Sequence, residues 1–121
     1  MERNIKEEGK FRYVEIGEGT PIIILHGLMG GLSNFDGVSD YFPKKGYKVV
    51  LPELPIYTLN ILKTNIKAFA KFVHDFVKHK KYEKIILLGN SLGGHIALYY
   101  TKMHPESVEA LIITGSSGLY E

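Results

Sequence analysis

Four short apolar runs are the feature of this sequence that most restricts its fold. They are rich in Ile, Val and Leu, and they read PIIIL at 21–25, YKVVL at 47–51, KIILL at 84–88 and ALIIT at 110–114. Each run is continuous rather than alternating and is too short for a helix of its own, which is typical of strands buried on both faces. The runs therefore predict a mostly parallel sheet with flanking helices.

Segments with helical periodicity separate these runs. Residues 65–81 place apolar side chains at spacings of three and four, and Thr64 or Asn65 can cap the start of the helix. We expect a second helix over residues 92–103, ending before the next proline, and a weaker one over residues 33–44. Because strands and helices alternate, the expected fold class is α/β.

Composition sets the size and the class of the protein. The chain has 121 residues, of which 45% are hydrophobic and 23% are charged, which suits one modest domain spanning residues 1–121. The net charge is +2, and the basic run KHKK at 78–81 is interpreted as the cationic end of a helix, so no nucleic-acid partner is expected. The absence of cysteine excludes disulfides, thiolate metal sites and a cysteine nucleophile.

The N-terminal region is polar. Its first ten residues lack the apolar core of a signal peptide, and no apolar run in the chain is long enough to span a bilayer. These features predict a cytoplasmic protein without a membrane span. Residues 10–21 predict an outer strand and a glycine-rich turn, and we expect an N-terminal hairpin that turns at Gly9.

Two glycine-rich motifs follow two of the predicted strands, at the edge where α/β sheets bind ligands. They read HGLMGG at 26–31 and GNSLGG at 89–94. The second fits G-x-S-x-G, in which a serine lies on a sharp turn between a strand and a helix. Gly89 and Gly93 allow the close backbone approach that this turn needs. The turn should present the Ser91 hydroxyl at a helix N-terminus, where backbone N–H groups can stabilise an oxyanion.

The first motif can contribute to the same place. Its glycines, beginning with Gly27, allow a loop whose backbone N–H groups point toward the hydroxyl of Ser91. We predict that the backbone N–H groups of Leu28 and Leu92 form the oxyanion hole. His26 is expected to hold the loop by hydrogen bonds rather than to accept a proton from the serine.

On these two motifs the sequence resembles the α/β-hydrolase fold superfamily, in its branch of esterases, lipases and related acyl hydrolases with a serine nucleophile. HGLMG resembles the oxyanion-loop motif of the family, GNSLGG resembles its nucleophile elbow, and the strand at 110–114 resembles the strand after the elbow helix. The resemblance covers essentially the whole chain. It implies a serine hydrolase of ester or related acyl bonds, with Ser91 as the nucleophile, a small-molecule acyl substrate and no cofactor.

Two local departures from the family pattern concern the pocket. Asn90 stands where the family often has histidine. The segment PELPIYTLN at 52–60 contains two prolines and none of the glycines that the family often has there, so we interpret it as a stiffer wall of the pocket. The second departure weakens any analogy with the substrates of close esterase subfamilies.

The third departure is a missing base. A serine nucleophile needs a base and a group that orients the base, and in this fold the chain order is serine, acid, histidine. After Ser91 the sequence offers His95, His104, three glutamates and no aspartate. His95 is better explained by helix packing, and His104 by a cation at the end of a helix. We therefore expect the N-terminal part of a single hydrolase domain, incomplete at its C-terminus, with the triad acid and histidine beyond residue 121.

Other interpretations remain for these features. A glycine-rich turn can also bind phosphate or be purely structural, although neither G-x-G-x-x-G nor a P-loop motif is present. No H-E-x-x-H spacing indicates a metal site, and we expect His74 and His79 to lie near solvent. The alternative function is a non-catalytic half-domain or assembly module that self-associates through the exposed edge of its last strand.

Overall fold

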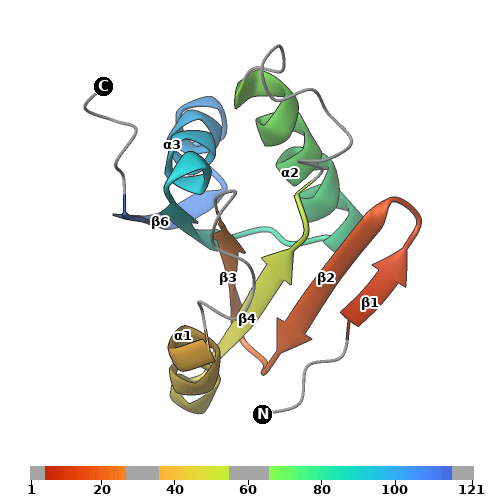
Figure 1. Ribbon diagram of the computed structural model, residues 1–121, viewed down its shortest axis with the longest axis vertical. Coiled ribbons are helices and arrows are strands. Elements are labelled where there is room, and N and C mark those ends of the chain that lie inside the picture. The colour runs from red at the N-terminus through yellow and green to blue at the C-terminus, as the bar shows by residue number, and fades with distance from the viewer. Residues whose placement is uncertain (1–4, 27–35, 55–65, 116–121) are drawn as a thin grey trace.

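The fold is built on one six-stranded sheet (Figure 1). The computed structural model describes residues 5–26, 36–54 and 66–115. The strands are β1 (Ile5–Glu8), β2 (Phe11–Ile16), β3 (Thr20–Leu25), β4 (Tyr47–Pro52), β5 (Ile85–Asn90) and β6 (Val108–Thr114). Their order across the sheet is β1-β2-β4-β3-β5-β6. β2 pairs antiparallel with both of its neighbours, β1 and β4. β4, β3, β5 and β6 are mutually parallel, which confirms the mostly parallel sheet.

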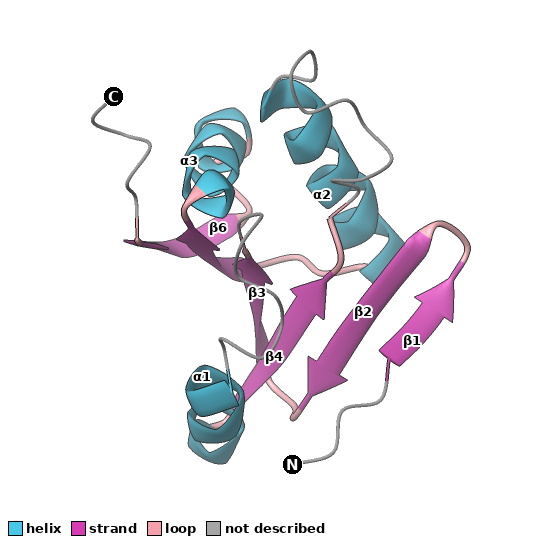
Figure 2. Cartoon of the chain, viewed as in Figure 1, coloured by secondary structure: helices cyan, strands magenta, loops and turns pink. Residues whose placement is uncertain are grey.

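Helices cover both faces of the sheet (Figure 2). The helical elements are α1 (Asp36–Tyr41), the 3-10 helix η2 (Pro43–Lys45), α2 (Ile66–Lys80) and α3 (Leu92–Met103). On one face α2 and α3 pack together over a core that includes Phe69, Phe76 and Tyr100. On the other face, Val38 and Phe42 cover a smaller core of aliphatic strand residues. β3, β4 and β5 lie between these two layers and are buried on both faces, which explains their continuous apolar sequences. The expectation of burial on both faces is wrong for the run at 110–114, because β6 is at the edge of the described sheet and has no buried residue.

The elements agree with most of the sequence expectations. The helix predicted over residues 92–103 is confirmed with the same bounds, and α2 matches the helix predicted over residues 65–81. The hairpin is confirmed, because β1 and β2 pair across a turn in which Gly9 has φ of 63°. The candidate caps at positions 64 and 65 lie outside the described residues.

The helix predicted over residues 33–44 is wrong in its C-terminal part. Its first three residues lie outside the described part of the chain, and α1 ends at Tyr41. Pro43 then begins the 3-10 helix, because proline has no N–H to continue the α-helical hydrogen bonds. Gly46, with φ of 90°, closes this turn with a hydrogen bond to the carbonyl of Pro43 and leads into β4.

Candidate functional site

A single residue, Ser91, connects β5 to α3. Asn90 is the last residue of the strand and Leu92 is the first residue of the helix. Ser91 has φ of 58° and ψ of −120°, a backbone conformation that residues with a side chain rarely adopt. Such strain persists only where the surrounding structure imposes it. The predicted bend between strand and helix is therefore present at position 91.

Close backbone packing imposes this bend. A Cβ atom at Gly89 would lie 2.7 Å from the Cα atom of Gly94, and one at Gly93 would overlap the carbonyl oxygen of Leu25. The start of α3 is thus pressed against the ends of β5 and β3. This contact explains why the sequence needs glycine two positions before and two positions after Ser91.

Hydrogen bonds fix the turn to its neighbours. The N–H of Ser91 donates to the carbonyl oxygen of Thr114 at 3.2 Å, and the carbonyl oxygen of Ser91 accepts from the N–H of Gly94 at 2.8 Å. The Thr114 hydroxyl donates to Oδ1 of Asn90 at 3.3 Å. The end of β6 therefore holds the residues on which the turn is built. Gly115 follows with φ of 51°, and a Cβ atom there would strike the Asn90 amide oxygen.

The Ser91 side chain is not used to cap the helix. Within the described residues it makes no capping hydrogen bond to the first turn of α3, although serine is a common N-cap. Ser91 is half-buried, so part of it faces solvent. Leu92 is the first residue of α3, so its N–H has no acceptor within the helix. In the same turn, the N–H of Gly94 donates to the carbonyl oxygen of Ser91. The Ser91 hydroxyl and the backbone N–H of Leu92 consequently belong to adjacent residues at this helix N-terminus.

The first glycine motif begins at the same edge of the sheet. β3 and β5 are parallel neighbours, with Leu25 opposite Gly89. His26, which follows Leu25, is buried with 9% of its surface exposed. Gly27 and Leu28 lie outside the described residues, so their predicted roles stay predictions. Because Leu25 lies opposite Gly89, both glycine motifs begin at the same level of the sheet.

The other described histidines lie on α2, on α3 or directly after α3. His95 lines a hollow of about 340 Å³ together with Ile66 and Leu98. His79, on α2, lies 2.8 Å from a carboxylate oxygen of Glu8. Among the described residues, no group of three or more histidine, aspartate or glutamate side chains could hold a metal ion.

His74 and His104 form a pair that the sequence did not indicate. Their rings stack with centroids 4.3 Å apart and an angle of 5° between the planes. The expectation that His74 lies near solvent is therefore wrong in part: burial lowers the pKa of His74, and the neighbouring His104 lowers it further. The two residues are thirty positions apart on different helices, so only the packing of α2 against α3 brings them together.

A polar cluster surrounds Glu15 on β2. Its carboxylate accepts hydrogen bonds from the Tyr82 hydroxyl at 2.7 Å and from the ammonium group of Lys6 at 3.1 Å. Lys80 and Lys48 lie 3.2 and 3.6 Å away. Burial by itself would raise the pKa of Glu15, but the hydrogen bonds and positive charges outweigh burial and lower the pKa to about 2. This cluster joins the C-terminal end of α2 to the sheet.

The described helices include none that is long and apolar enough to cross a bilayer.

Comparison with known proteins identifies the fold. The model of the alpha/beta hydrolase fold family matches residues 20–119. The chain is 69% identical, with a TM-score of 0.90, to an alpha/beta hydrolase enzyme from the metagenome of sediments from the lagoon of Mar Chica, Morocco, covering 98% of this chain and 54% of that one. It is 29% identical to a marine microorganism esterase, with a TM-score of 0.74, covering 85% of this chain and 40% of the esterase.

A relative found by sequence comparison is also a hydrolase. The chain is 30% identical to 2-hydroxy-6-oxo-6-(2'-aminophenyl)hexa-2,4-dienoic acid hydrolase from Metapseudomonas resinovorans, over 98% of this chain and 43% of that protein. The chain thus spans about half the length of the proteins that it matches. The family match covers most of the 121 residues and includes both glycine motifs. The chain belongs to the alpha/beta hydrolase fold family.

Proposed function

We propose that this chain is the N-terminal part of a serine hydrolase domain that cleaves ester or related acyl bonds, with Ser91 as the nucleophile. The observation that carries the proposal is the conformation of Ser91, a strained residue that alone joins β5 to α3 and whose side chain does not cap the helix. A strained serine between a strand and a helix is the geometry of a nucleophile elbow. The two relatives named as an esterase and a dienoic acid hydrolase support hydrolytic chemistry.

In the proposed reaction the Ser91 hydroxyl attacks the carbonyl carbon of a small-molecule acyl substrate. The hydroxyl proton passes to a histidine, the carbonyl oxygen becomes an oxyanion, and the leaving group then departs with a proton from the same histidine. The backbone N–H groups of Leu92 and Leu28 would stabilise the oxyanion. Water releases the acyl group from the serine in the second half of the reaction.

We place the histidine and its orienting acid beyond residue 121. His74 and His104 contact each other around the C-terminal end of α3, and His79 pairs with Glu8. The helix that separates His104 from the turn has 12 residues, or about 18 Å at 1.5 Å per residue. A general base must lie within hydrogen-bond reach of the hydroxyl, or reach it through one water molecule.

A chimera tests this proposal directly. Residues 1–121 would replace the matching part of the Mar Chica hydrolase, which is 69% identical over the aligned region. We expect the chimera to hydrolyse a short p-nitrophenyl ester and Ser91→Ala to lower its kcat by about 10⁴-fold or more. Ser107→Ala is the matched control, because Ser107 lies on the turn after α3, and it should retain activity. Turnover that survives Ser91→Ala would reject Ser91 as the nucleophile.

The chain itself can be tested with a fluorophosphonate. If the histidine lies outside these residues, labelling of Ser91 should be slow in the chain alone and fast in the chimera. Peptide mass spectrometry would locate the label. Equally rapid labelling in both proteins would contradict the placement of the base beyond residue 121.

A second candidate function rests on the edge strand β6. This strand pairs with β5 on one side, lies at the edge of the described sheet, and leaves Ile112 39% exposed. An unpaired edge with an exposed apolar residue can pair with a second copy of the chain. The corresponding function is that of a non-catalytic half-domain or assembly module.

Sedimentation as a function of concentration tests this second candidate. We expect the chain to associate and Ile112→Lys to keep it monomeric, because a lysine on an edge strand opposes pairing. Ile5→Lys places the same charge on β1 at the opposite edge and should leave association unchanged. A chain that stays monomeric at high concentration would exclude this candidate.

A further inference from the structure

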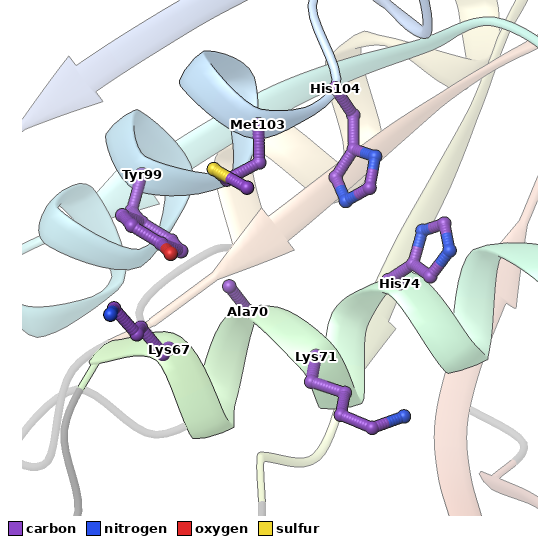
Figure 3. Close-up of a pocket in the computed structure, with 7 residues that line it drawn as sticks. All are labelled: Lys67, Ala70, Lys71, His74, Tyr99, Met103 and His104. Atoms are coloured by element: carbon purple, nitrogen blue, oxygen red, sulfur yellow. The ribbon is translucent and has the colours of Figure 1, made fainter.

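A pocket of about 280 Å³ lies between α2 and α3. Ala70 on α2 and Tyr99 and Met103 on α3 form its apolar middle (Figure 3). Lys67 lies at one end of the pocket, and the stacked pair of His74 and His104 lies at the other. The pocket is therefore apolar in the centre and basic at both ends.

No acidic side chain lines this pocket in the described part of the chain. Lys71, which also lines it, extends away from α3 in Figure 3 and lies 3.4 Å from the carboxylate of Asp75. Lys67 is exposed and faces the tyrosine end of the pocket. The basic groups that remain for a ligand are therefore Lys67 at one end and the two histidines at the other.

The histidine end has an unused polar atom. Nδ1 of His74 is buried and has no hydrogen-bond partner among the described residues. An unpartnered buried nitrogen costs free energy, which a ligand could recover once the ring turns to bring this atom to the pocket surface. The stacked rings do not suit a metal, because parallel imidazoles direct their nitrogen lone pairs alongside one another rather than toward a common point.

The distance between the two ends limits the ligand. Lys67 and His74 are seven residues apart on one helix, which corresponds to about 10 Å along its axis. The histidine end of this pocket lies about 18 Å from Ser91 along α3, because Met103 is the last residue of the 12-residue helix that Ser91 precedes. A ligand here would not occupy the proposed acyl site.

We propose that this pocket binds a small dianionic organic molecule, a dicarboxylate whose apolar body lies over Ala70 and Met103. One carboxylate pairs with the ammonium group of Lys67, and the other accepts hydrogen bonds from the histidine pair. Binding requires a basic group at each end and an apolar surface between them, and all three are present. The histidine end gains its positive charge when it takes up a proton. The proposal does not depend on the chemistry of Ser91.

Binding should be coupled to the uptake of a proton. An anion beside the histidines favours their charged form, so affinity should rise as the pH falls through the pKa of His74, which burial and His104 lower. Other groups that face His74 also influence its protonation. They are Lys71, Asp75 and Lys78 on α2, Tyr100 on α3, and His104 directly after α3. A dicarboxylate remains ionised between pH 6 and pH 8. A change of affinity in that range therefore reflects protonation of the protein and not of the ligand.

Titration of octanedioate into the 121-residue chain, followed by calorimetry and NMR, tests the proposal. We expect saturable binding that shifts the resonances of Ala70 and Met103. Octanoate, with one carboxylate, should bind at least about threefold more weakly, and octanediamide, with none, should not bind. Equal binding of octanedioate and octanediamide, or no shifts at the pocket residues, would overturn the proposal.

Two pairs of variants locate the charges. Lys67→Ala should weaken octanedioate binding by about threefold or more, whereas Lys44→Ala removes an exposed lysine of the 3-10 helix η2, outside the pocket, and should not. His74→Gln should flatten the rise in affinity from pH 8 to pH 6, whereas His79→Gln should preserve it. If the control variants weaken binding as much as the pocket variants, the anion binds through general surface charge and the pocket is not a site.

Discussion

The backbone N–H of Ser91 donates a hydrogen bond to the carbonyl oxygen of Thr114, with 3.2 Å between nitrogen and oxygen. This bond links the turn after β5 to the last residue of β6, and the side chains of Asn90 and Thr114 add a second link at 3.3 Å. The turn is therefore supported from three directions, by β3 through Gly93, by β5 in which it begins, and by the end of β6.

Substitution of Gly93 tests the contact with β3. Gly93→Ala should lower the free energy of unfolding by about 3 kcal/mol or more, because the new methyl group would overlap the carbonyl oxygen of Leu25. Gly37→Ala is the matched control, since a Cβ atom at this position in α1 meets no atom within 4 Å, and it should raise stability by up to about 1 kcal/mol. Urea denaturation measures both. Equal effects of the two substitutions would show that the close contact is not important for stability.

Substitution of Ser91 itself tests the strain at the turn. Ser91→Gly should be more stable than Ser91→Ala by about 1 to 2 kcal/mol, because glycine adopts φ of 58° and ψ of −120° without the steric cost that a Cβ atom brings. The comparison removes the hydroxyl in both variants and so isolates the backbone. Thermal denaturation of the two proteins under one condition is sufficient, and an alanine variant as stable as the glycine variant would show that the turn is unstrained.

Loss of the hydrogen bond between Thr114 and Asn90 should reduce stability less than the substitutions at Gly93 and Ser91. Thr114→Val removes the hydroxyl that donates to Oδ1 of Asn90 and should cost about 0.5 to 1 kcal/mol of stability. Thr114→Ser keeps a hydroxyl at the same position and should recover most of that loss. In the chimera described above, Thr114→Val should also slow the labelling of Ser91 by fluorophosphonate. Unchanged labelling would limit the role of this link to stability.

The Glu15 cluster predicts a dependence of stability on pH. The folded-state pKa of about 2 lies below the ordinary value of 4.5, so the carboxylate stabilises the fold above pH 4.5 and loses this effect as the pH falls toward 2. Glu15→Gln should therefore be less stable than the wild type by about 2 kcal/mol near pH 6, a value reduced from the full shift because solvent screens part of the cluster.

The control for Glu15 is an exposed glutamate on the turn between β2 and β3, Glu18. Glu18→Gln should leave the pH profile unchanged. Urea denaturation between pH 6 and pH 2.5 would show the difference between wild type and Glu15→Gln shrinking on acidification. A difference that stays constant over this range would mean that Glu15 stabilises the fold through packing alone.

The local elements could be predicted because local sequence determines them. The continuous apolar runs indicated buried parallel strands, and the glycines around Ser91 indicated the turn, since both signals depend on neighbouring residues. The helix expected over residues 33–44 extends past Pro43, which has no N–H to continue α-helical hydrogen bonds, and α1 accordingly ends at Tyr41. The pair of His74 and His104 had no sequence signal, since it depends on the distance and rotation between two helices. The order of strands across the sheet likewise depends on contacts that no short segment contains.

The parallel pairing of Leu25 with Gly89 has a consequence for how such a protein can change. β3 and β5 end at the same level of the sheet, and close backbone contacts at Gly89 and Gly93 lock the turn at Ser91. Substitutions away from these glycines would leave the proposed nucleophile in place. Selection can thus alter the surroundings of the proposed site while the position of the Ser91 hydroxyl stays unchanged.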